Sequence, residues 1–515
     1  MIRMVVVIFV LLVRVYSAGA QVSNATPPTR VAEQAREYRK ANEHRIVREL
    51  VELLAIPNVA ADTANIQRNA AKLVEMLERR GIRTQRLPIP GRGPVVFGEL
   101  RAPRATRTLI FYCHYDGQPV TPNQWVDTKP FEPALRTASM EAAGRRIPFP
   151  EPTSSYGDDW RIYARSASDD KSPIVAILTA LDALRAQKIP LAVNLKFVLD
   201  GEEEDGSPNL ERVLLAHREL LRGDLLVIAD GPVHQTGRPL VFFGNRGILD
   251  VELTVYGPVR PLHSGHYGNW APNPAMRLAQ LLATMKDADG RALIEGFYDD
   301  VTPLSEIERR AIAAVPDHDA AIARSFGLAA VEGSGKRLVE LIHLPSLNVR
   351  GLLSADVGDL ARTIVPDRAT ASLDLRLVKN VLPERQFERL VTHIRKQGYY
   401  VTRNEPNAEE RAKYPRIARV VMGPSYPAAR TAMDLEVSQA LVRVVEEAVG
   451  GPAVKLPTLG GSGPMYIFER LGVPVIGVPI VNHDNNQHAA NENLRLGNFW
   501  RGMEIFAALL ADLKW

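Results

Sequence analysis

The chain has 515 residues, of which 46% are hydrophobic and 24% are charged, as in a globular protein of two or three domains. The formal net charge is only +4, and no Lys/Arg block with interleaved aromatic residues occurs, which argues against nucleic acid as a partner. Cys113 is the only cysteine, which excludes an intrachain disulfide and a cysteine-based zinc site. Any metal ion must therefore be bound by His, Asp and Glu side chains.

The N-terminus has the pattern of a cleaved secretory signal. Arg3 precedes an apolar stretch at 4–13, and small residues follow shortly afterwards. Because Arg14 interrupts the stretch, and a bilayer span takes about 20 apolar residues, we do not expect this segment to cross a membrane. We expect residues 1–20 to be removed, the protein to be secreted or periplasmic, and no membrane attachment to remain.

A polar, Pro-containing linker at 21–33 leads into a stretch whose apolar spacing predicts a helix up to Pro57. Apolar, β-branched runs then alternate with helical stretches. The predicted strands are VVFGEL, TLIFYC, NLKFVL, DLLVIA and VPVIGVPI, at 95–100, 108–113, 194–199, 224–229 and 473–480. Helices are predicted at 171–187 and 438–449. This alternation predicts an α/β domain with a mostly parallel sheet and helices on both faces.

The pattern changes between residues 246 and 414. Strands that alternate with period two and amphipathic helices are predicted at 248–257, 369–378, 273–285 and 384–397. We therefore expect an inserted α+β domain at 246–414, which divides the α/β domain into 34–245 and 415–515. The Pro-rich segment at 138–159 is predicted to be a long loop.

Side chains that can bind metal ions follow four of the predicted strands. They are His114 and Asp116, the acidic run GEEEDGS at 201–207, Asp230, and the pair His483 and His488; Asp169 and Asp170 precede a predicted helix. Taken alone, an acidic run is typical of a solvated loop, and a single His or Asp of a turn or a helix cap. Because the carboxyl ends of strands form the binding crevice of an open α/β sheet, the five groups together predict a two-metal site of carboxylates and imidazoles.

These residues resemble the di-zinc aminoacylase, carboxypeptidase and dipeptidase family, and most closely its carnosinase-like dipeptidase branch. The motifs that carry the resemblance are HYDGQPV, SASDDKSP, GEEEDGS, ADG, RPLHSGHYG, TIVPDRATASLDLRLV, GGSGPMY and QHAANE, in this order. They extend over nearly the whole chain after the signal. The resemblance implies a catalytic α/β domain interrupted by a dimerisation (lid) domain, and a homodimer.

The resemblance also implies a ligand set for two zinc ions per subunit, with Mn²⁺ or Co²⁺ as possible substitutes. Asp169 would bridge the two ions. His114 and Asp230 would complete the protein ligands of one ion, and Glu204 and His488 those of the other. Imidazole nitrogen and carboxylate oxygen suit zinc.

Three catalytic roles follow from the same resemblance. Glu203 would be the general base, which takes a proton from water and passes it to the leaving amine. Asp116 would orient His114. His263 would reach the active site of the partner subunit and stabilise the oxyanion, although the local sequence alone is typical of a turn residue.

Two residues would contact the substrate. Arg376 matches the family arginine that holds the C-terminal carboxylate, although an arginine on an alternating strand is by itself typical of a solvated face. The backbone and hydroxyl of Ser462 would also meet the substrate. In Ala164-Arg165-Ser166 and at Ser172, the chain lacks glycines that the family often has, which brings into question the tightness of the backbone near Asp169.

The sequence predicts a zinc-dependent hydrolase that cleaves the amide bond of a dipeptide or of a small substrate with a C-terminal carboxylate. An N-acyl amino acid hydrolase with the same di-metal chemistry is the alternative, since the ligand residues do not separate the two. A non-catalytic binding protein of the same fold is a further alternative, but a binding protein has no need of a general base such as Glu203.

Overall fold

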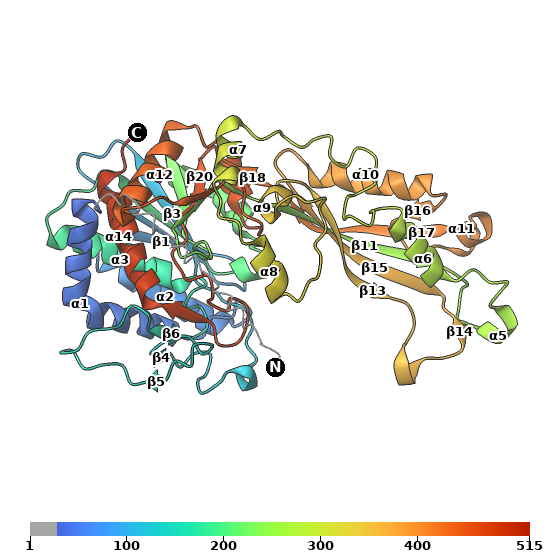
Figure 1. The fold of residues 1–515 in the computed structure, drawn as a ribbon, viewed down its shortest axis with the longest axis horizontal. Coiled ribbons are helices and arrows are strands. Elements are labelled where there is room, and N and C mark those ends of the chain that lie inside the picture. The colour runs from blue at the N-terminus through green and yellow to red at the C-terminus, as the bar shows by residue number, and fades with distance from the viewer. Residues whose placement is uncertain (1–27) are drawn as a thin grey trace, which may run out of the picture.

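The computed structural model of the protein describes residues 28–515, and its centre is an eight-stranded sheet (Figure 1). In spatial order its strands are β1 (Arg83–Leu87), β2 (Val95–Leu100), β7 (Asn194–Asp200), β3 (Thr108–His114), β8 (Leu225–Ile228), β20 (Val475–Gly477), β9 (Leu240–Phe242) and β19 (Val454–Leu456). The central strands β7, β3, β8 and β20 run parallel to one another. Strand β2 is antiparallel to its neighbours β1 and β7, and β9 is antiparallel to β20. The predicted mostly parallel α/β sheet is confirmed.

Helices cover both faces of this sheet. One face carries α1 (Arg30–Leu54), α2 (Thr63–Glu78), α3 (Lys171–Ala186), α12 (Glu436–Val449) and α14 (Leu496–Asp512), and the other carries α4 (Leu210–Ala216) and α13 (Met465–Arg470). Alternate residues of β3 therefore enter different cores: Leu109 and Phe111 pack on the first face, Ile110 and Tyr112 on the second. Because both faces are buried, the strand reads as a continuous apolar run.

The N-terminal helix begins within the expected linker. The side-chain oxygen of Thr29 accepts a hydrogen bond from the backbone N–H of Ala32 and caps α1, so the helix starts at Arg30 rather than after residue 33. The expected signal at 1–20 lies outside the described residues. Within residues 28–515, no helix combines the length and the apolar character that crossing a bilayer requires.

The inserted segment forms a second, five-stranded sheet that extends away from the first (Figure 1). Its strands, in spatial order, are β13 (Ser346–Leu353), β15 (Arg368–Leu377), β11 (Gly247–Tyr256), β17 (Ile417–Tyr426) and β16 (Tyr400–Thr402). Helices α6 (Pro274–Ala283) and α10 (Pro383–Lys396) pack on its apolar face. This sheet continues beyond the expected boundary at residue 414, because β17 pairs along β11 as the chain returns.

Three short helices connect α6 to β13. They are α7 (Glu306–Ala313), α8 (Asp319–Ser325) and α9 (Leu338–Leu341). Figure 1 shows α8 and α9 between the two large sheets, and α7 packs its Ala311 and Ile312 into the cores of the eight-stranded sheet. Part of the expected insert therefore belongs to the wall of the catalytic domain.

The remaining elements are short. They are β4 (Ala134–Arg136), β5 (Arg146–Ile147), β6 (Arg161–Tyr163) and β21 (Asn493–Arg495) in one sheet, the pairs β10 (Gly244–Asn245) with β18 (Ala429–Arg430) and β12 (Leu262–His263) with β14 (Ile364–Val365), and α5 (Ser264–Tyr267) and α11 (Ala408–Lys413). The Pro-rich segment at 138–159, expected to be a loop, contains β5, which forms a hairpin with β4. The hairpin satisfies backbone groups that a free loop would leave to solvent.

Candidate metal centre

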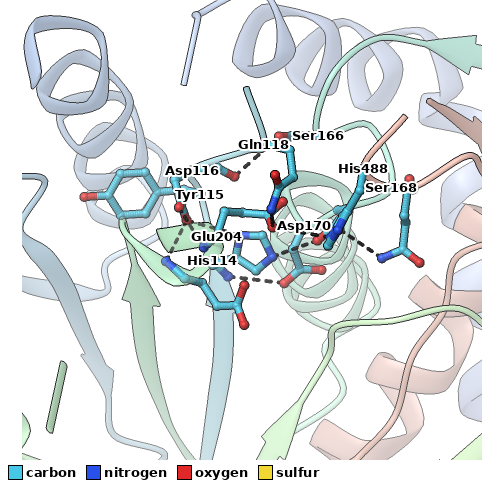
Figure 2. A network of polar contacts seen from close by, with 12 residues as sticks. His114, Tyr115, Asp116, Gln118, Ser166, Ser168, Asp170, Glu204 and His488 are labelled. Carbon is cyan, nitrogen blue, oxygen red and sulfur yellow. Dashed lines mark hydrogen bonds and ion pairs between the residues drawn. The ribbon is translucent and has the colours of Figure 1, made fainter. Parts of the chain in front are cut away.

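Five of the predicted site residues meet at one edge of the eight-stranded sheet. His114 ends β3, Glu204 lies in a single 3₁₀ turn that follows β7, Asp230 follows β8, and His488 lies in the loop after β20. Because these four strands are parallel neighbours, the segments that follow them emerge at the same edge. Asp169 joins them from the loop that leads into α3. Figure 2 shows His114, Glu204 and His488 of this group from close by.

His114 is fully buried and is held from two sides. Its Nε2 lies 2.8 Å from Oδ1 of Asp169, and its Nδ1 lies 3.3 Å from Oδ1 of Asp116. The carboxylate of Asp116 also accepts the backbone N–H groups of Glu203 and Glu204, at 3.1 and 3.0 Å. Asp116 thus ties the end of β3 to the turn after β7, which fixes both the imidazole and the acidic run.

His488 closes the cluster on the solvent side. Its Nε2 lies 3.2 Å from Oδ2 of Asp169 and 3.3 Å from Oε2 of Glu204. Two amides hold the same carboxylates, since Gln118 donates to Glu204 at 2.7 Å and Gln487 donates to Asp169 at 3.0 Å. The side chain of His488 is 59% exposed, so the cluster is accessible to a small solute.

The loop that carries Asp169 is fixed by Glu492. The buried carboxylate of Glu492 accepts the backbone N–H groups of Ser166, Ser168 and Asp169, each at 3.0 Å. It also accepts from the Ser168 hydroxyl at 2.9 Å and from Arg165 at 2.7 Å. One buried side chain thus sets the backbone from which Asp169 projects.

Ser166 stands where the family often has glycine, and it adopts a backbone conformation that favours glycine. Ser166 has φ +60°, the left-handed region in which glycine is the default residue. The hydroxyl of Ser166 accepts a hydrogen bond from Asn58 at 2.8 Å and donates one to the backbone oxygen of Asp116 at 3.4 Å. Together with the hydrogen bond from the backbone N–H of Ser166 to Glu492, these bonds stabilise a backbone conformation that is unfavourable for serine.

The donor set fits divalent metal ions. Two groups of three residues have ligand atoms within 4.8 Å of one another: His114 with Asp169 and Glu204, and His114 with Asp170 and Asp230. Imidazole nitrogen and carboxylate oxygen are ligands of zinc and of similar divalent ions. The second group contains Asp170, which the sequence places beside Asp169 but which the family resemblance does not give as a ligand. The carboxylate of Asp170 also accepts the backbone N–H of His114 at 3.2 Å.

The pKa values of the buried carboxyl groups in the cluster also favour a bound cation. Burial, followed by the negative charge of Asp169, raises the pKa of Glu204 to about 7 and that of Asp230 to about 6. Burial also raises the pKa of Glu203 well above its ordinary value. For Asp169, burial acts in the same sense, but hydrogen bonds from His114 and His488 outweigh it and hold the pKa well below the ordinary value. Carboxylates crowded in this way are stabilised by a cation between them.

The acidic side chains of the run at 201–207 have different surroundings. Glu202 is buried and accepts the backbone N–H of Asn209 at 2.9 Å, and Asp205 is exposed and pairs with Arg92 at 2.6 Å. Glu203 is half-buried, and no residue within 28–515 donates a hydrogen bond to its carboxylate. It lines a small cavity of about 20 Å³ and is the one carboxylate of the run without a structural partner.

The structure brings Arg376 and Ser462 together. Arg376 lies on β15 of the five-stranded sheet, and its Nη1 donates to Oγ of Ser462 at 2.8 Å. Gly463, which follows Ser462 in the chain, lines the same small cavity as Glu203. The Nε of Arg376 also lies 3.5 Å from Oδ2 of Asp374, so the guanidinium is held by Asp374 and Ser462 together.

The structure does not bring His263 to the cluster of its own chain. His263 is exposed on β12, and Figure 1 shows the neighbouring β14 and α5 at the end of the five-stranded sheet that is remote from the catalytic domain. Its Nδ1 accepts the backbone N–H of Gly265 at 3.1 Å, which is the turn contact that the local sequence predicts. Any contact between His263 and a site of this kind therefore requires a second subunit.

Sequence reasoning missed the residues that support the ligands. Glu492, Gln118 and Gln487 lie in the quoted motifs, but nothing in their local pattern distinguishes them from surface polar residues. Their burial and partners are properties of the assembled loops. His483, which also follows the last predicted strand, is exposed and lies outside the cluster.

The fold and the cluster define an α/β protein with an inserted domain and a centre of imidazole and carboxylate ligands at the carboxyl edge of its parallel strands. The model of peptidase family M20/M25/M40 matches residues 110–512, and the chain belongs to this family. The resemblance drawn from the motifs is confirmed, and with it the prediction of a peptidase.

Similar proteins cover nearly the whole chain. It is 26% identical over 490 residues to the Cys-Gly metallodipeptidase dug1 of Schizosaccharomyces pombe, covering 91% of this chain and 95% of that one. It is 26% identical over 521 residues to the human Beta-Ala-His dipeptidase, covering 95% and 94%. The crystal structure of the M20 family metallo-carboxypeptidase Sso-CP2 from Sulfolobus solfataricus matches with a TM-score of 0.74 and 30% identity, covering 90% and 98%. Human carnosine dipeptidase 1 shares the fold, with a TM-score of 0.71, 23% identity and coverage of 95% and 99%.

Proposed function

We propose that the protein is a metal-dependent exopeptidase that cleaves the amide bond of a dipeptide, or of a small substrate with a free carboxylate at its C-terminal side. The observation that carries this proposal is the cluster of His114, Asp169 and Glu204, whose ligand atoms lie within 4.8 Å of one another. The relatives that are named as dipeptidases and the structural neighbour that is named as a carboxypeptidase support it.

We propose two zinc ions per subunit as the cofactor, with Mn²⁺ or Co²⁺ as substitutes. Asp169 would bridge them, with His114 and Asp230 on one ion and Glu204 and His488 on the other. The two groups of ligand atoms, His114 with Asp169 and Glu204 and His114 with Asp170 and Asp230, support a metal centre in which carboxylates lie on both sides of His114. When bound, divalent ions of this kind polarise the scissile carbonyl and lower the pKa of water to about 7.

Other residues of the chain would transfer the proton, bind the substrate and orient a ligand. The carboxylate of Glu203, which has no structural partner, would accept a proton from the attacking water and donate it to the nitrogen of the leaving amine. Arg376 would hold the substrate carboxylate through its guanidinium, with Ser462 orienting that group. Asp116 would keep the imidazole of His114 in the orientation that ligation requires.

An N-acyl amino acid hydrolase is the second candidate, since Arg376 would serve such a substrate equally well. A non-catalytic binding protein of the same fold is less favoured, because such a protein has no need of a carboxylate without a structural partner at Glu203.

The test is elemental analysis of the purified mature protein, combined with a hydrolysis panel of dipeptides and N-acyl amino acids before and after chelation. We expect about two zinc ions per chain and cleavage that chelation abolishes and zinc restores. Absence of stoichiometric metal after reconstitution, together with absence of cleavage, would refute the proposal and leave the binding protein as the better account.

We also propose that residues 1–20 are a secretory signal, that the mature protein is secreted or periplasmic, and that it is a homodimer. The basic, apolar and small-residue order of the segment supports the first two. The remote position of His263 supports the third, because a partner subunit is what would bring this residue to a site. N-terminal sequencing of exported protein tests the signal and the export. Light scattering tests the homodimer.

A further inference from the structure

The segment at 244–247, with the sequence GNRG, connects the catalytic domain to the inserted domain. It follows β9 of the eight-stranded sheet, contains β10 and leads into β11 of the five-stranded sheet. The returning chain passes directly beside it, because β18 pairs with β10. A Cβ atom on Gly244 would collide with the backbone oxygen of Ala429, and one on Gly247 with that of Tyr426. The two glycines therefore permit the close approach of the two connections between the domains.

The two residues between these glycines hold the loop that carries Ser462. Nδ2 of Asn245 donates to the backbone oxygen of Gly463 at 2.9 Å, and the backbone N–H of Arg246 donates to that of Gly461 at 3.0 Å. Both residues are buried, Asn245 at 4% and Arg246 at 8% exposure. Because the two bonds reach the residues on either side of Ser462, they fix the backbone from which the hydroxyl of Ser462 projects.

The guanidinium of Arg246 reaches the inserted domain. Its Nη2 donates to the backbone oxygen of Leu344 at 2.6 Å and to Oγ of Ser346 at 3.1 Å. Ser346 begins β13 and lies directly opposite Arg376 of β15. Arg246 is therefore bonded to a neighbour of Arg376 in one domain and to a neighbour of Ser462 in the other. No residue within 28–515 accepts a hydrogen bond from the buried Nε of Arg246.

The charges of Arg246 and Arg376 also act on each other. Burial, followed by the positive charge of Arg376, lowers the pKa of Arg246 to about 10, and the negative charge of Asp374 acts in the opposite sense. Asp374 also lies 3.5 Å from Nε of Arg376, so one carboxylate acts on two cations. An anion bound at Arg376 would therefore be stabilised by both positive charges.

We infer that Asn245 and Arg246 are positioning residues for the site that binds the substrate carboxylate. They hold the loop of Ser462 and the start of β13 in one relative position across the domain junction, and so fix the orientation in which the guanidinium of Arg376 receives a carboxylate. The inference rests on the proposed function, because it takes Arg376 as the residue that binds this group. It assigns a role to a motif that the metal chemistry does not use.

The first test measures the preference for a carboxylate, as the ratio of kcat/KM between the best substrate of the hydrolysis panel and the C-terminal amide of that substrate. In Arg246→Met and in Asn245→Ala we expect this ratio to fall about 10-fold, because a displaced guanidinium no longer fits the carboxylate. The loss should lie in KM for the carboxylate substrate, since this contact forms before the chemical step. Arg246→Lys keeps the charge and should lose less than Arg246→Met.

Arg238→Met is the matched control. Arg238 also donates to two backbone oxygens, those of Pro452 and Ala453 at 3.2 and 3.4 Å. These residues precede β19 and belong neither to the loop of Ser462 nor to the inserted domain. The ratio in Arg238→Met should stay within about twofold of the wild-type value.

Circular dichroism verifies that each variant is folded. If Arg246→Met or Asn245→Ala unfolds, Arg246→Lys or Asn245→Ser replaces it, with an expected fall in the ratio of about threefold. An unchanged ratio in a folded variant would overturn the assignment of that residue, and an equal fall in Arg238→Met would overturn the inference as a whole. Both results leave the proposed hydrolase intact.

Calorimetric titration separates the inference from the proposed chemistry. In a Glu203→Gln background, which prevents turnover, Ala-Ala or N-acetyl-alanine should bind at least about 10-fold more tightly than its C-terminal amide, and Arg246→Met should remove the difference. This binding result, with no cleavage of any substrate by the enzyme that retains Glu203, would uphold the positioning role and refute the hydrolase. Equal binding of carboxylate and amide in the Glu203→Gln background would refute the carboxylate site and the inference with it, whatever the enzyme cleaves.

Discussion

The guanidinium of Arg376 donates a hydrogen bond to the hydroxyl of Ser462 at 2.8 Å, although the two residues are 86 positions apart and lie in different domains. The bond joins β15 of the five-stranded sheet to the loop before α13. The orientation of the guanidinium is therefore set by both domains together.

Arg376→Lys should weaken the use of substrates with a free C-terminal carboxylate. A charged hydrogen bond contributes about 1.5–3 kcal/mol, and lysine cannot reproduce the planar fork, so we expect kcat/KM to fall roughly 10-fold to 100-fold. The control is the matching dipeptide amide, which lacks the carboxylate and should be cleaved equally by both enzymes. An equal loss on the amide would show that Arg376 acts on the fold and not on the carboxylate.

Glu492→Gln should lower both stability and metal affinity. Removing one partner of the buried pair with Arg165 leaves an uncompensated charge and costs about 3–5 kcal/mol of unfolding free energy. Because Glu492 also holds the backbone of Asp169, metal affinity should fall about 10-fold to 100-fold. Denaturant unfolding and competition with a metal indicator measure the two effects.

Asp205→Asn is the matched control for this change. Asp205 also pairs with an arginine, Arg92, but both side chains are substantially exposed, so the loss should be about 0–1 kcal/mol. If Glu492→Gln and Asp205→Asn had the same small effect, the assignment of Glu492 as the support of the Asp169 loop would be wrong.

Glu203→Gln should leave the fold and the bound metal intact and lower turnover by at least about 100-fold, because the amide cannot accept the proton from water. Elemental analysis and kcat on a dipeptide measure these together. Asp205→Asn again serves as the control, since it neutralises a neighbouring carboxylate that pairs with Arg92 instead of facing the cluster. Retained activity in Glu203→Gln would place the general base elsewhere.

His263→Ala should be inactive, and mixing it with Glu203→Ala under subunit exchange should restore activity. In a mixed dimer one site has Glu203 from one chain and an intact His263 from the other, so random exchange should recover about a quarter of the wild-type rate. Light scattering and a labelled subunit verify the exchange. Verified exchange without recovery would contradict a site shared between subunits.

The small cavity beside Glu203 is lined by two tyrosines that come from different domains. Tyr426, at the end of β17, stacks on Tyr466 of α13, with ring centroids 5.4 Å apart. The expected boundary at residue 414 assigned the segment of β17 to the catalytic domain. Its pairing with β11 is a contact between segments far apart in the sequence, which local periodicity does not report.

The sequence by itself determined the α/β alternation and the kinds of ligand. A strand buried on both faces is a continuous apolar run, so TLIFYC and NLKFVL predict the strands β3 and β7. The polar residues that follow these parallel strands then lie at the edge of the sheet. The single buried cysteine, Cys113, left only imidazoles and carboxylates to bind a metal. These features depend on short stretches of chain, which carry their own pattern.

Only the tertiary structure decided how those ligands are supported and what surrounds them. Glu492 reaches Asp169 across 323 positions, Arg376 meets Ser462 across 86, and His263 lies remote from the cluster of its own chain. The physical reason is that burial and hydrogen-bond geometry depend on which distant segments meet. A glutamate that is solvated in one fold is the centre of a buried network in another.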